Sequence, residues 1–257
     1  MSTLDAAQIT HYAPEISLQL HACVESTQAI AHTLAALGER GPTAIFADEQ
    51  TAGRGQRGRR WHSPPNAAIY LTLLWPSTRR LAELSGLSLA LGLAVHSVLA
   101  DLGIKAEVKW PNDVLVNGRK IAGILVEILS DPRGSIQLIG IGLNIDLHPE
   151  DARSIDQANT DMCTHLPDCP SRSEIAGRLL RAASARLRAF ESSGLQSMLA
   201  EWHAADALAG ADVNWTIGES IQRATVIGID EVGRLRVTLH GVERLIVAGD
   251  VQVRRAH

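Results

Sequence analysis

The N-terminal third of the chain carries hydrophobic patterns that predict strands alternating with helices. Apolar and polar residues alternate over residues 16–20, which is typical of a strand with one buried face. Continuous apolar segments at residues 43–47 and 67–75 predict buried strands, and Pro76 is expected to end the second one, because proline lacks an N–H for the sheet. Residues 28–37 have apolar positions three and four residues apart and predict a helix.

Three further segments show neither clear alternation nor a one-sided helical pattern. Residues 81–102 are apolar on nearly every side of a helix, so we expect one long core helix lying across the sheet. Residues 1–14 show no clear period and predict a loosely held arm. Residues 146–169 are polar and contain proline, which predicts an irregular segment.

The C-terminal part of the chain changes from helical to β-rich patterns. Apolar periodicity predicts helices at residues 173–190 and 194–208. Short β-rich segments then predict a small barrel, and they span residues 213–217, 221–229, 235–240, 243–247 and 251–253, with turn signals at Gly218-Glu219, residues 231–233 and Gly241. We therefore expect an α+β fold, with a mixed sheet and packed helices in residues 1–209 and a small β barrel in residues 210–257.

The composition narrows the class of protein. The 257 residues carry 24 lysines and arginines against 28 aspartates and glutamates, a net charge of −4. A general nucleic-acid binder would be basic, so the charge argues against that class. The N-terminus has no basic segment leading into an apolar one, and no uninterrupted apolar run approaches membrane-spanning length. The sequence therefore predicts a cytoplasmic protein without membrane contact.

Positive charge is concentrated in residues 50–61, named here the arginine loop. The stretch contains four arginines and three glycines, a composition that neither buries itself nor holds a regular helix. Glycine lets a ligand approach the main chain closely, and arginine offers a planar fork of donors for phosphate and carboxylate. The stretch therefore predicts a loop that binds an anion.

Other interpretations of the arginine loop compete with this one. Gly53, Gly55 and Gly58 match the dinucleotide-binding fingerprint, but the apolar segment before them ends early, and Pro64 and Pro65 oppose the helix that must follow. A basic run also occurs in nucleic-acid patches and in plain solvated loops. Local positive charge on a slightly acidic protein favours a small anionic ligand over a long polyanion.

The three cysteines are expected to be reduced thiols. No Cys-x-x-Cys pair occurs, and the cluster of Cys163, His165 and Cys169 has no plausible fourth ligand nearby. Structural zinc sites use four closely spaced ligands, so this cluster does not predict one.

Two short segments carry candidate ligand-binding groups. Ser26 and Thr27 stand just before the first predicted helix, where a hydroxyl either caps the helix or binds a polar ligand group, and spacing alone favours capping. Asn117 and Gly118 separate two β-rich segments and predict a two-residue hairpin turn.

That turn would pair Val116 with Arg119, Leu115 with Lys120, and Asp113 with Ala122. Asp113 and Lys120 would then lie diagonally on one face of the hairpin. They form either a surface ion pair or part of a nucleotide site, in which Asp113 holds magnesium and Lys120 faces a phosphate or carboxylate.

Five motifs, in order over about residues 24–145, resemble the catalytic domain of the biotin protein ligase family. They are Glu25-Ser-Thr-Gln28, Gly53-Arg-Gly-Gln-Arg-Gly-Arg59, Lys109-Trp-Pro-Asn-Asp113, Lys120-Ile-Ala-Gly-Ile-Leu-Val-Glu127 and Gly140-Ile-Gly-Leu-Asn-Ile145. The resemblance implies a class II synthetase-like catalytic domain with a C-terminal SH3-like barrel. It also implies an enzyme that uses ATP and Mg²⁺ to activate biotin as biotinyl-5'-AMP and transfers it to a lysine of a biotin carboxyl carrier domain, as in acetyl-CoA carboxylase.

The resemblance assigns roles to individual residues. The electrostatic work of catalysis would fall to Lys120, Arg54, Lys109 and Asp113, with Asp113 also holding the metal. Biotin would be bound by Ser26, Thr27, Gln28, Gln50, Arg54, Gly55, Gln56, Lys120 and Gly123. ATP and the adenylate would be bound by Arg57, Arg59, Trp61, Asn112 and Asn144, with Trp61 stacking on adenine.

Two features depart from the commonest bacterial pattern. Gln56 stands where the family loop usually has an arginine that helps to retain the adenylate, so we expect this ligase to hold its intermediate less tightly. About two dozen residues precede Ser26, too few for the DNA-binding module of bifunctional relatives, so no DNA binding or repressor function is expected.

Two alternatives and one question of assembly stay open at this stage. A lipoate-type ligase or acyltransferase shares the fold but not the arginine loop. A non-enzymatic module could instead use that loop to bind RNA or another anion. A homodimer with its catalytic sheets side by side is compatible with the family.

Overall fold

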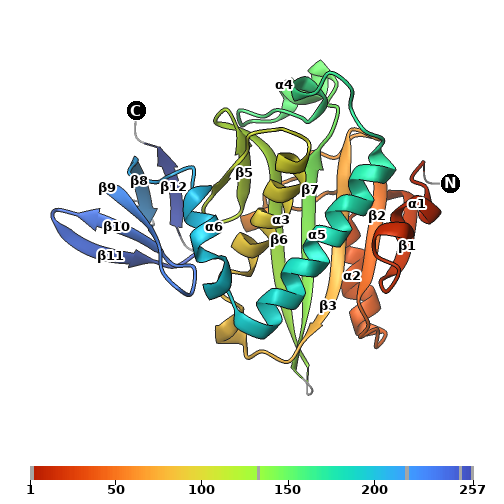
Figure 1. Ribbon diagram of the computed structural model, residues 1–257, viewed down its shortest axis with the longest axis horizontal. Coiled ribbons are helices and arrows are strands. Elements are labelled where there is room, and N and C mark those ends of the chain that lie inside the picture. The colour runs from red at the N-terminus through yellow and green to blue at the C-terminus, as the bar shows by residue number, and fades with distance from the viewer. Residues whose placement is uncertain (1–2, 132–133, 218–219, 249–250, 256–257) are drawn as a thin grey trace.

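The computed structural model describes residues 3–131, 134–217, 220–248 and 251–255. Its larger part is a seven-stranded mixed sheet of order β1-β2-β3-β7-β6-β5-β4, as the expected α+β fold requires (Figure 1). Strands β1 and β2 are parallel, and the other neighbours are antiparallel. The strands are β1 (Ser17–Val24), β2 (Thr43–Gln50), β3 (Ala68–Ser77), β4 (Glu107–Lys109), β5 (Asp113–Val116), β6 (Arg119–Asp131) and β7 (Gly134–Asn144).

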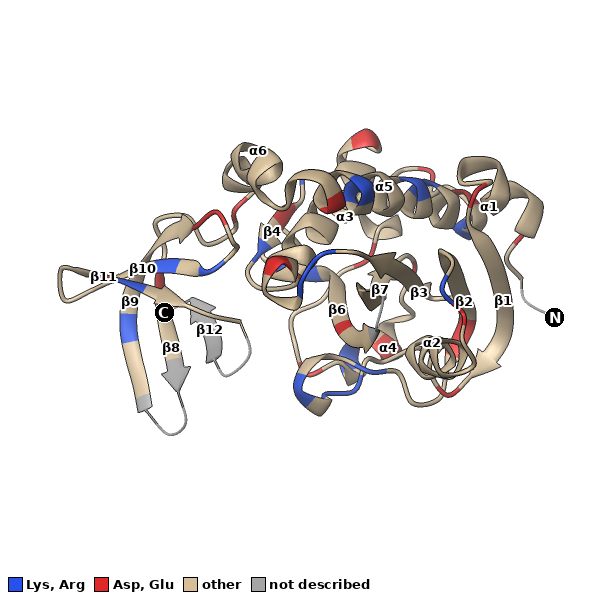
Figure 2. Cartoon of the chain, turned by 90° about the horizontal axis from the view of Figure 1, so that it is seen from below, with Lys and Arg blue, Asp and Glu red and all other residues tan. Residues whose placement is uncertain are grey.

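Helices cover the two faces of this sheet unequally. α3 (Leu87–Asp101) and α5 (Arg172–Ser193) pack on one face, and α2 (Thr27–Ala36) lies on the other (Figure 2). The face under α3 and α5 holds the large core, whereas Ala31 and Ala35 of α2 share a small second core with β2, β3 and β7. The basic segments of the arginine loop lie on the α2 side of the sheet.

The expectation of a loosely held arm at residues 1–14 is wrong over the described residues. Asp5 caps α1 (Ala6–Tyr12) by accepting from two backbone N–H groups, and Ile9 is fully buried. Tyr12 packs against Gly177 of α5, where an added side chain would collide with its ring. A seven-residue helix has too few turns to show a period in the sequence, and packing on α5 stabilises it.

The apolar segment 81–102 is not one helix. A 3₁₀ turn, η2 (Leu81–Leu84), comes first, Gly86 takes a φ of 81°, and α3 begins at the next residue. Glycine is required there because φ is positive and because a Cβ would lie 2.8 Å from the Leu195 side chain. By length and composition alone Leu81–Asp101 could pass for a membrane span, but most of it is buried inside the protein, as expected for a core segment.

Three predicted boundaries are also wrong. β2 continues past residue 47 to Gln50, and β3 passes through Pro76 to Ser77. Pairing of β3 with β2 stops at Leu74, so Pro76 has a strand neighbour on the β7 side only and its missing N–H costs little. The predicted helix at residues 194–208 is the 3₁₀ turn η4 (Gln196–Met198) followed by α6 (Leu199–Ala204).

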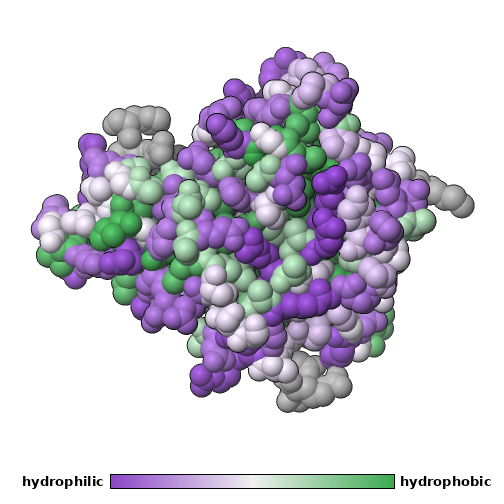
Figure 3. Space-filling model, viewed as in Figure 1, coloured by the Kyte–Doolittle hydropathy of each residue, from purple (hydrophilic) through white to green (hydrophobic). Residues whose placement is uncertain are grey.

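The C-terminal part is a five-stranded antiparallel sheet of order β11-β10-β9-β8-β12. Its strands are β8 (Asp212–Ile217), β9 (Ser220–Ile229), β10 (Leu235–Leu239), β11 (Val242–Ile246) and β12 (Val251–Arg255). Turns occur at residues 231–233 and at Gly241 as predicted, whereas the predicted Gly218-Glu219 turn lies outside the described residues. Exposed hydrophobic residues of this part are Ile221, Ile227, Val242 and Leu245 on the strands and Val247 just after β11. Figure 3 shows hydrophobic residues on the visible face of this sheet.

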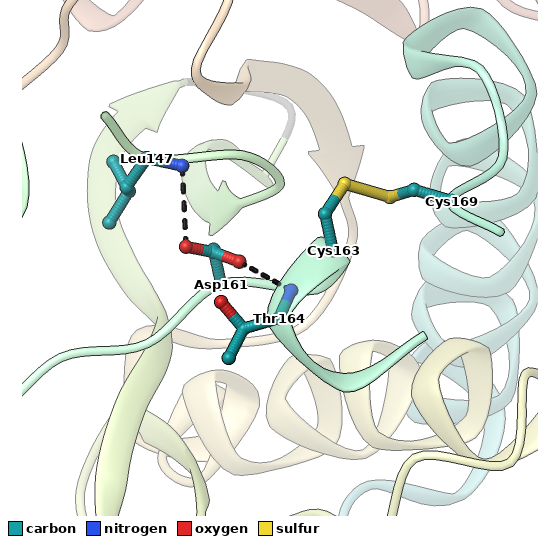
Figure 4. The surroundings of a disulfide bond; sticks show 5 residues. All are labelled: Leu147, Asp161, Cys163, Thr164 and Cys169. Carbon is teal, nitrogen blue, oxygen red and sulfur yellow. Dashed lines mark hydrogen bonds between the residues drawn. A yellow bond between two sulfur atoms is a disulfide. The ribbon is translucent and has the colours of Figure 1, made fainter. Parts of the chain in front are cut away.

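The segment between β7 and α5 is largely irregular, as predicted, but it holds a disulfide. It contains α4 (Pro149–Ser154) and the 3₁₀ turn η3 (Cys163–His165). Cys163 and Cys169 are bonded, so the expectation of reduced thiols is wrong for this pair (Figure 4). Asp161 organises the approach to η3 by accepting from the N–H groups of Leu147 and Thr164 at 3.3 and 2.8 Å.

Candidate active site

An open cleft lies on the α2 face of the sheet, between the start of α2, the arginine loop and the hairpin of β5 and β6. Its cavity volume is small, about 60 Å³. Most of the residues that the sequence singles out meet here, although they come from distant parts of the chain. Its lining includes Ser26, Thr27, Gln28, Gln50, Arg54, Gly55, Gln56, Trp61, Asn112, Lys120 and Gly123.

Three glycines form the floor of the cleft. Gly123 of β6 pairs directly with Gly142 of β7, and Gly140 lies two residues before Gly142 on the same face. Because side chains alternate along a strand, all three positions face α2 and leave the main chain bare. The ring of Trp61 lies on this floor, so close that a Cβ on Gly142 would stand 2.5–2.8 Å from its atoms.

Uncharged hydroxyls and amides form the wall of the cleft beside α2. Ser26 caps α2, as predicted, by accepting from the Gln28 N–H at 3.2 Å. The Thr27 N–H donates to Gln50 Oε1 at 2.9 Å. The hydroxyls of Thr27 and Thr72 are 2.8 Å apart, and Thr72 donates to Gln28 Oε1 at 3.1 Å. All these side chains are buried, so their hydrogen bonds hold each group in one orientation.

The hairpin of β5 and β6 brings Lys120 and Asp113 together. The two pairs nearest the turn are as predicted, but Asp113 pairs with Gly123 instead of Ala122, because a bulge shifts the register by one residue. Lys120 Nζ lies 2.5 Å from Asp113 Oδ1, an ion contact that lacks hydrogen-bond geometry. The two side chains are only 18% and 16% exposed, so the pair is not a plain surface ion pair.

The arginine loop folds back on itself. The Gly55 N–H donates to the Arg59 carbonyl at 2.7 Å, and the Trp61 N–H donates to the Gly53 carbonyl at 2.9 Å. A single 3₁₀ turn, η1 (Gln56–Gly58), stands where the dinucleotide fingerprint needs a helix, which excludes that interpretation.

A second, more open hollow lies between the arginine loop and β6. Arg54, Arg57 and Arg59 line it together with Leu125 and Glu127. Arginines thus contribute to the lining of a hollow beside the first cleft, as an anion-binding loop requires.

The far end of the arginine loop is fixed to the body of the protein. Lys120 Nζ lies 5.2 Å from the ring centroid of Trp61, within cation–π range. The Tyr70 hydroxyl donates to the Pro64 carbonyl at 2.8 Å, and burial raises the pKa of Tyr70 far above its usual value, so the group stays a neutral donor. His62 pairs with Asp151 of α4 at 2.9 Å, which ties the loop to that helix.

Besides Asp113, which contacts Lys120 but does not line the cleft, three predicted site residues lie differently from the rest. Lys109 is on β4, outside the lining of the cleft. Asn144, at the end of β7, donates to the Thr160 carbonyl at 3.0 Å and does not line the cleft. Asn112 does line it, but its amide donates to the Ile124 carbonyl at 2.9 Å and so spans the bulge. The ligand roles of these three residues stay predictions.

Sequence reasoning missed several residues of the site. Thr72 and Tyr70 stand at alternate positions in a strand that is otherwise almost wholly apolar, and that polar stripe was the available signal. Glu127 closes one of the recognised motifs but received no role, and its partner His32 lies one helical turn after Gln28. Glu127 of β6 meets His32 and Gln28 only because α2 packs against the sheet beside β6.

Comparison with known proteins gives consistent similarities. A profile of the biotin/lipoate A/B protein ligase family matches residues 20–146. The chain is 32% identical to the bifunctional ligase/repressor BirA of Escherichia coli, over 98% of this chain and 79% of that protein. It is also 32% identical to the biotin–[acetyl-CoA-carboxylase] ligase of Paracoccus denitrificans, over 88% of this chain and 96% of that one.

A solved structure supports the same relationship at the level of the fold. The biotin protein ligase from Aquifex aeolicus, solved in complex with biotin and ATP, superposes with a TM-score of 0.79. The match covers 93% of this chain and 99% of that one, at 28% sequence identity. The similarity therefore extends through both sheets.

Proposed function

Because this chain belongs to the biotin protein ligase family, we propose that its cleft joins biotin to ATP and passes the biotinyl group to a protein. In the first step, a carboxylate oxygen of biotin attacks the α-phosphorus of ATP, and the bond to the β-phosphate breaks to release pyrophosphate. In the second step, a lysine amine attacks the acyl carbon of biotinyl-5'-AMP, and AMP leaves as the amide forms. The acceptor is a biotin carboxyl carrier domain of acetyl-CoA carboxylase or a related carboxylase.

The observation that carries this proposal is the combination of an uncharged polar wall with cations from the loop and the hairpin. Amides and hydroxyls at Thr27, Gln28 and Gln50 match the cyclic urea of biotin, which has one carbonyl acceptor and two N–H donors. Lys120 and Arg54 line the same cleft and match a carboxylate and a phosphate. Neither a lipoyl nor an octanoyl chain would use the amide wall.

The chemistry asked of these cations is electrostatic. A carboxylate must approach a polyphosphate, and the two anions repel each other. Lys120 and Arg54 offset that repulsion and the charge that develops on the transferred phosphorus. The acyl adenylate forms directly between the substrates, so the proposal needs no covalent enzyme nucleophile.

Magnesium would enter with ATP, and the chain offers it one carboxylate. Among the residues that the structure describes, no three His, Cys, Asp or Glu side chains gather into a metal site. Mg²⁺ in nucleotide sites commonly uses one or two protein carboxylates and completes its shell with phosphate oxygens and water. Asp113 is the carboxylate that could serve, because it is mostly buried beside Lys120, whose Nζ contacts its Oδ1 at 2.5 Å and would have to share it with the metal. When bound, the metal would neutralise phosphate charge.

The remaining roles are proposed on the sequence motifs and the positions of the residues. Arg57, Arg59 and Trp61 would hold the nucleotide, since the two arginines line the outer hollow and Trp61 offers a flat ring beside it. The arginine loop would then cover the adenylate and exclude water that hydrolyses the mixed anhydride. A cytoplasmic location and a homodimer are proposed from the sequence and the family alone.

The direct test is mass spectrometry of a purified biotin carrier domain after incubation with this protein, ATP, Mg²⁺ and biotin. The expected result is one added biotinyl group on the carrier lysine, dependent on both ATP and biotin. Parallel reactions with lipoate and octanoate test the alternative acyl substrates. Addition of one of those groups in preference to biotin, or no addition at all, would overturn the proposal.

A further inference from the structure

At the edge of the cleft, the Glu127 carboxylate contacts the side-chain amide of Gln28 and the imidazole of His32. Glu127 Oε2 accepts from Gln28 Nε2 at 3.0 Å and lies 2.6 Å from His32 Nε2. Gln28 Nε2 also donates to the Leu138 carbonyl at 3.1 Å. Burial alone raises the pKa of Glu127, but the hydrogen bonds from Gln28 and His32 and the nearby charge of Arg54 outweigh it and lower that pKa, so the group is ionised at neutral pH.

These contacts decide which end of the Gln28 amide faces the cleft. An ionised carboxylate and a main-chain carbonyl only accept hydrogen bonds, so together they use both hydrogens of Gln28 Nε2. Gln28 Oε1 therefore points the other way, where it accepts from Thr72 at 3.1 Å. A Cβ on Gly140 would lie 3.2 Å from that oxygen, which places it over the glycine floor.

The same wall carries a second amide oxygen, that of Gln50. The hydroxyls of Thr27 and Thr72 lie 2.8 Å apart and share two hydrogens among three contacts, which are this one, Thr72 to Gln28 Oε1 and Thr27 to Gln50 Oε1 at 3.1 Å. Gln50 Oε1 accepts from the Thr27 N–H. Acceptor oxygens therefore dominate this side of the cleft, and they suit a ligand that presents N–H donors.

We propose that Glu127, held by His32, is a positioning residue that keeps the Gln28 carbonyl turned toward the ligand and so selects a cyclic urea. This inference rests on the proposed function, because it assumes that the cleft binds biotin through its ureido ring. With an amide in place of the Glu127 carboxylate, only the Leu138 carbonyl would still require the Nε2 end of Gln28, so the preference for this orientation weakens. A reversed Gln28 amide would turn its NH₂ toward the N–H groups of the ligand. A site built around buried hydrogen bonds strongly rejects a ligand that leaves one of them unmade.

A purely structural role predicts something different. The His32 and Glu127 side chains are 38% and 36% exposed, and an ion pair of that kind contributes little to stability. If the pair only joined α2 to β6, its loss would change the unfolding midpoint slightly and leave the Michaelis constant for biotin unaltered. The KM for biotin therefore distinguishes a positioning role from a purely structural one.

The test is steady-state kinetics of biotin-dependent pyrophosphate release for Glu127→Gln. We expect the KM for biotin to rise roughly tenfold, while kcat at saturating biotin and the KM for ATP stay within about twofold. Glu127→Asp keeps a carboxylate acceptor and should recover most of the affinity for biotin. The matched control is Glu174→Gln, which breaks an ion pair with Arg178 on α5 and should leave all three constants unchanged.

A double-mutant cycle asks whether Glu127 acts through Gln28. Gln28→Met should raise the KM for biotin by itself, and adding Glu127→Gln should raise it no further. Effects that multiply, or a Glu127→Asp variant as impaired as Glu127→Gln, would overturn the inference. If the unaltered protein releases no pyrophosphate in response to biotin, the proposed function fails. If it does and Glu127→Gln keeps the original KM for biotin, only the present inference fails.

Discussion

At the scale of single residues, Lys120 is the cation on which the proposed chemistry depends most. It lines the cleft and lies against both Asp113 and the ring of Trp61. We predict that Lys120→Ala lowers kcat for biotin-dependent pyrophosphate release by roughly a hundredfold or more, because a charge that stabilises the transition state is lost. Lys105→Ala removes an exposed lysine and serves as the control. A Lys120→Ala enzyme with nearly normal kcat would contradict the assignment.

Gln56 is the residue at which this chain departs from the usual arginine loop. Gln56 lines the cleft on the α2 face, so an arginine there would add a cation beside the adenylate. We predict that Gln56→Arg slows dissociation of biotinyl-5'-AMP about tenfold in the absence of carrier, because a charged hydrogen bond replaces a neutral one. Rapid filtration of enzyme-bound adenylate measures the rate. Gln196→Arg adds the same charge at an exposed position in η4, and an equal effect there would remove the idea.

At the scale of elements, the bare floor of β6 and β7 positions the Trp61 ring. A Cβ on Gly142 would lie 2.5–2.8 Å from that ring, so Gly142→Ala must displace it. If Trp61 stacks on adenine, the KM for ATP should rise by about tenfold while the KM for biotin changes less, because only the nucleotide contact is misplaced. Gly41→Ala is the control, since its Cβ would meet only Glu39 Oε1 at 3.4 Å. An unchanged KM for ATP would count against the stacking role.

The disulfide between Cys163 and Cys169 stabilises the segment that supports the β5–β6 hairpin. In that segment, the Ala158 carbonyl accepts from the Lys120 N–H at 2.9 Å, and the Thr160 N–H donates back at 2.9 Å. We predict that reduction lowers the free energy of unfolding by about 2 kcal/mol, the chain-entropy value for so short a loop. Urea unfolding with and without reductant measures the change. The variant with Cys163→Ser and Cys169→Ser should be insensitive to reductant, and an equal response from it would refute this account.

At the scale of the whole molecule, a buried indole joins the two sheets. Trp110 is 1% exposed, and its Nε1 donates at 3.0 Å to the carbonyl of Gly233, in the turn that joins β9 and β10 of the C-terminal sheet. We predict that Trp110→Phe costs about 1–3 kcal/mol beyond the loss of volume, because the Gly233 carbonyl loses its donor. Limited proteolysis should then release the C-terminal sheet faster.

The molecule supplies its own control for that substitution. Trp202 is equally buried, but its Nε1 has no hydrogen-bond partner among the described residues. Trp202→Phe therefore removes the same volume without removing a hydrogen bond. If both substitutions cost the same free energy of unfolding, the indole hydrogen bond contributes nothing to the joint between the sheets.

The sequence by itself determined the features that local chemistry controls. Continuous apolar segments and alternation located most strands, and Asn117 with Gly118 located the hairpin that brings Lys120 to Asp113. The helix cap at Ser26 followed from spacing. The five ordered motifs identified the family and most of the residues that line the cleft. They could do so because residues that bind one ligand are constrained in type wherever they lie along the chain.

Only the tertiary structure decided the features that depend on contacts between distant residues. Gly86 interrupts the long helix because Leu195 and the second sheet lie against it, and Cys163 meets Cys169 because the segment between them turns back. The bulge places Asp113 opposite Gly123, and the approach of α2 to β6 puts Glu127 behind Gln28. No local propensity encodes such contacts, since each requires two elements to be packed before either side chain has a partner.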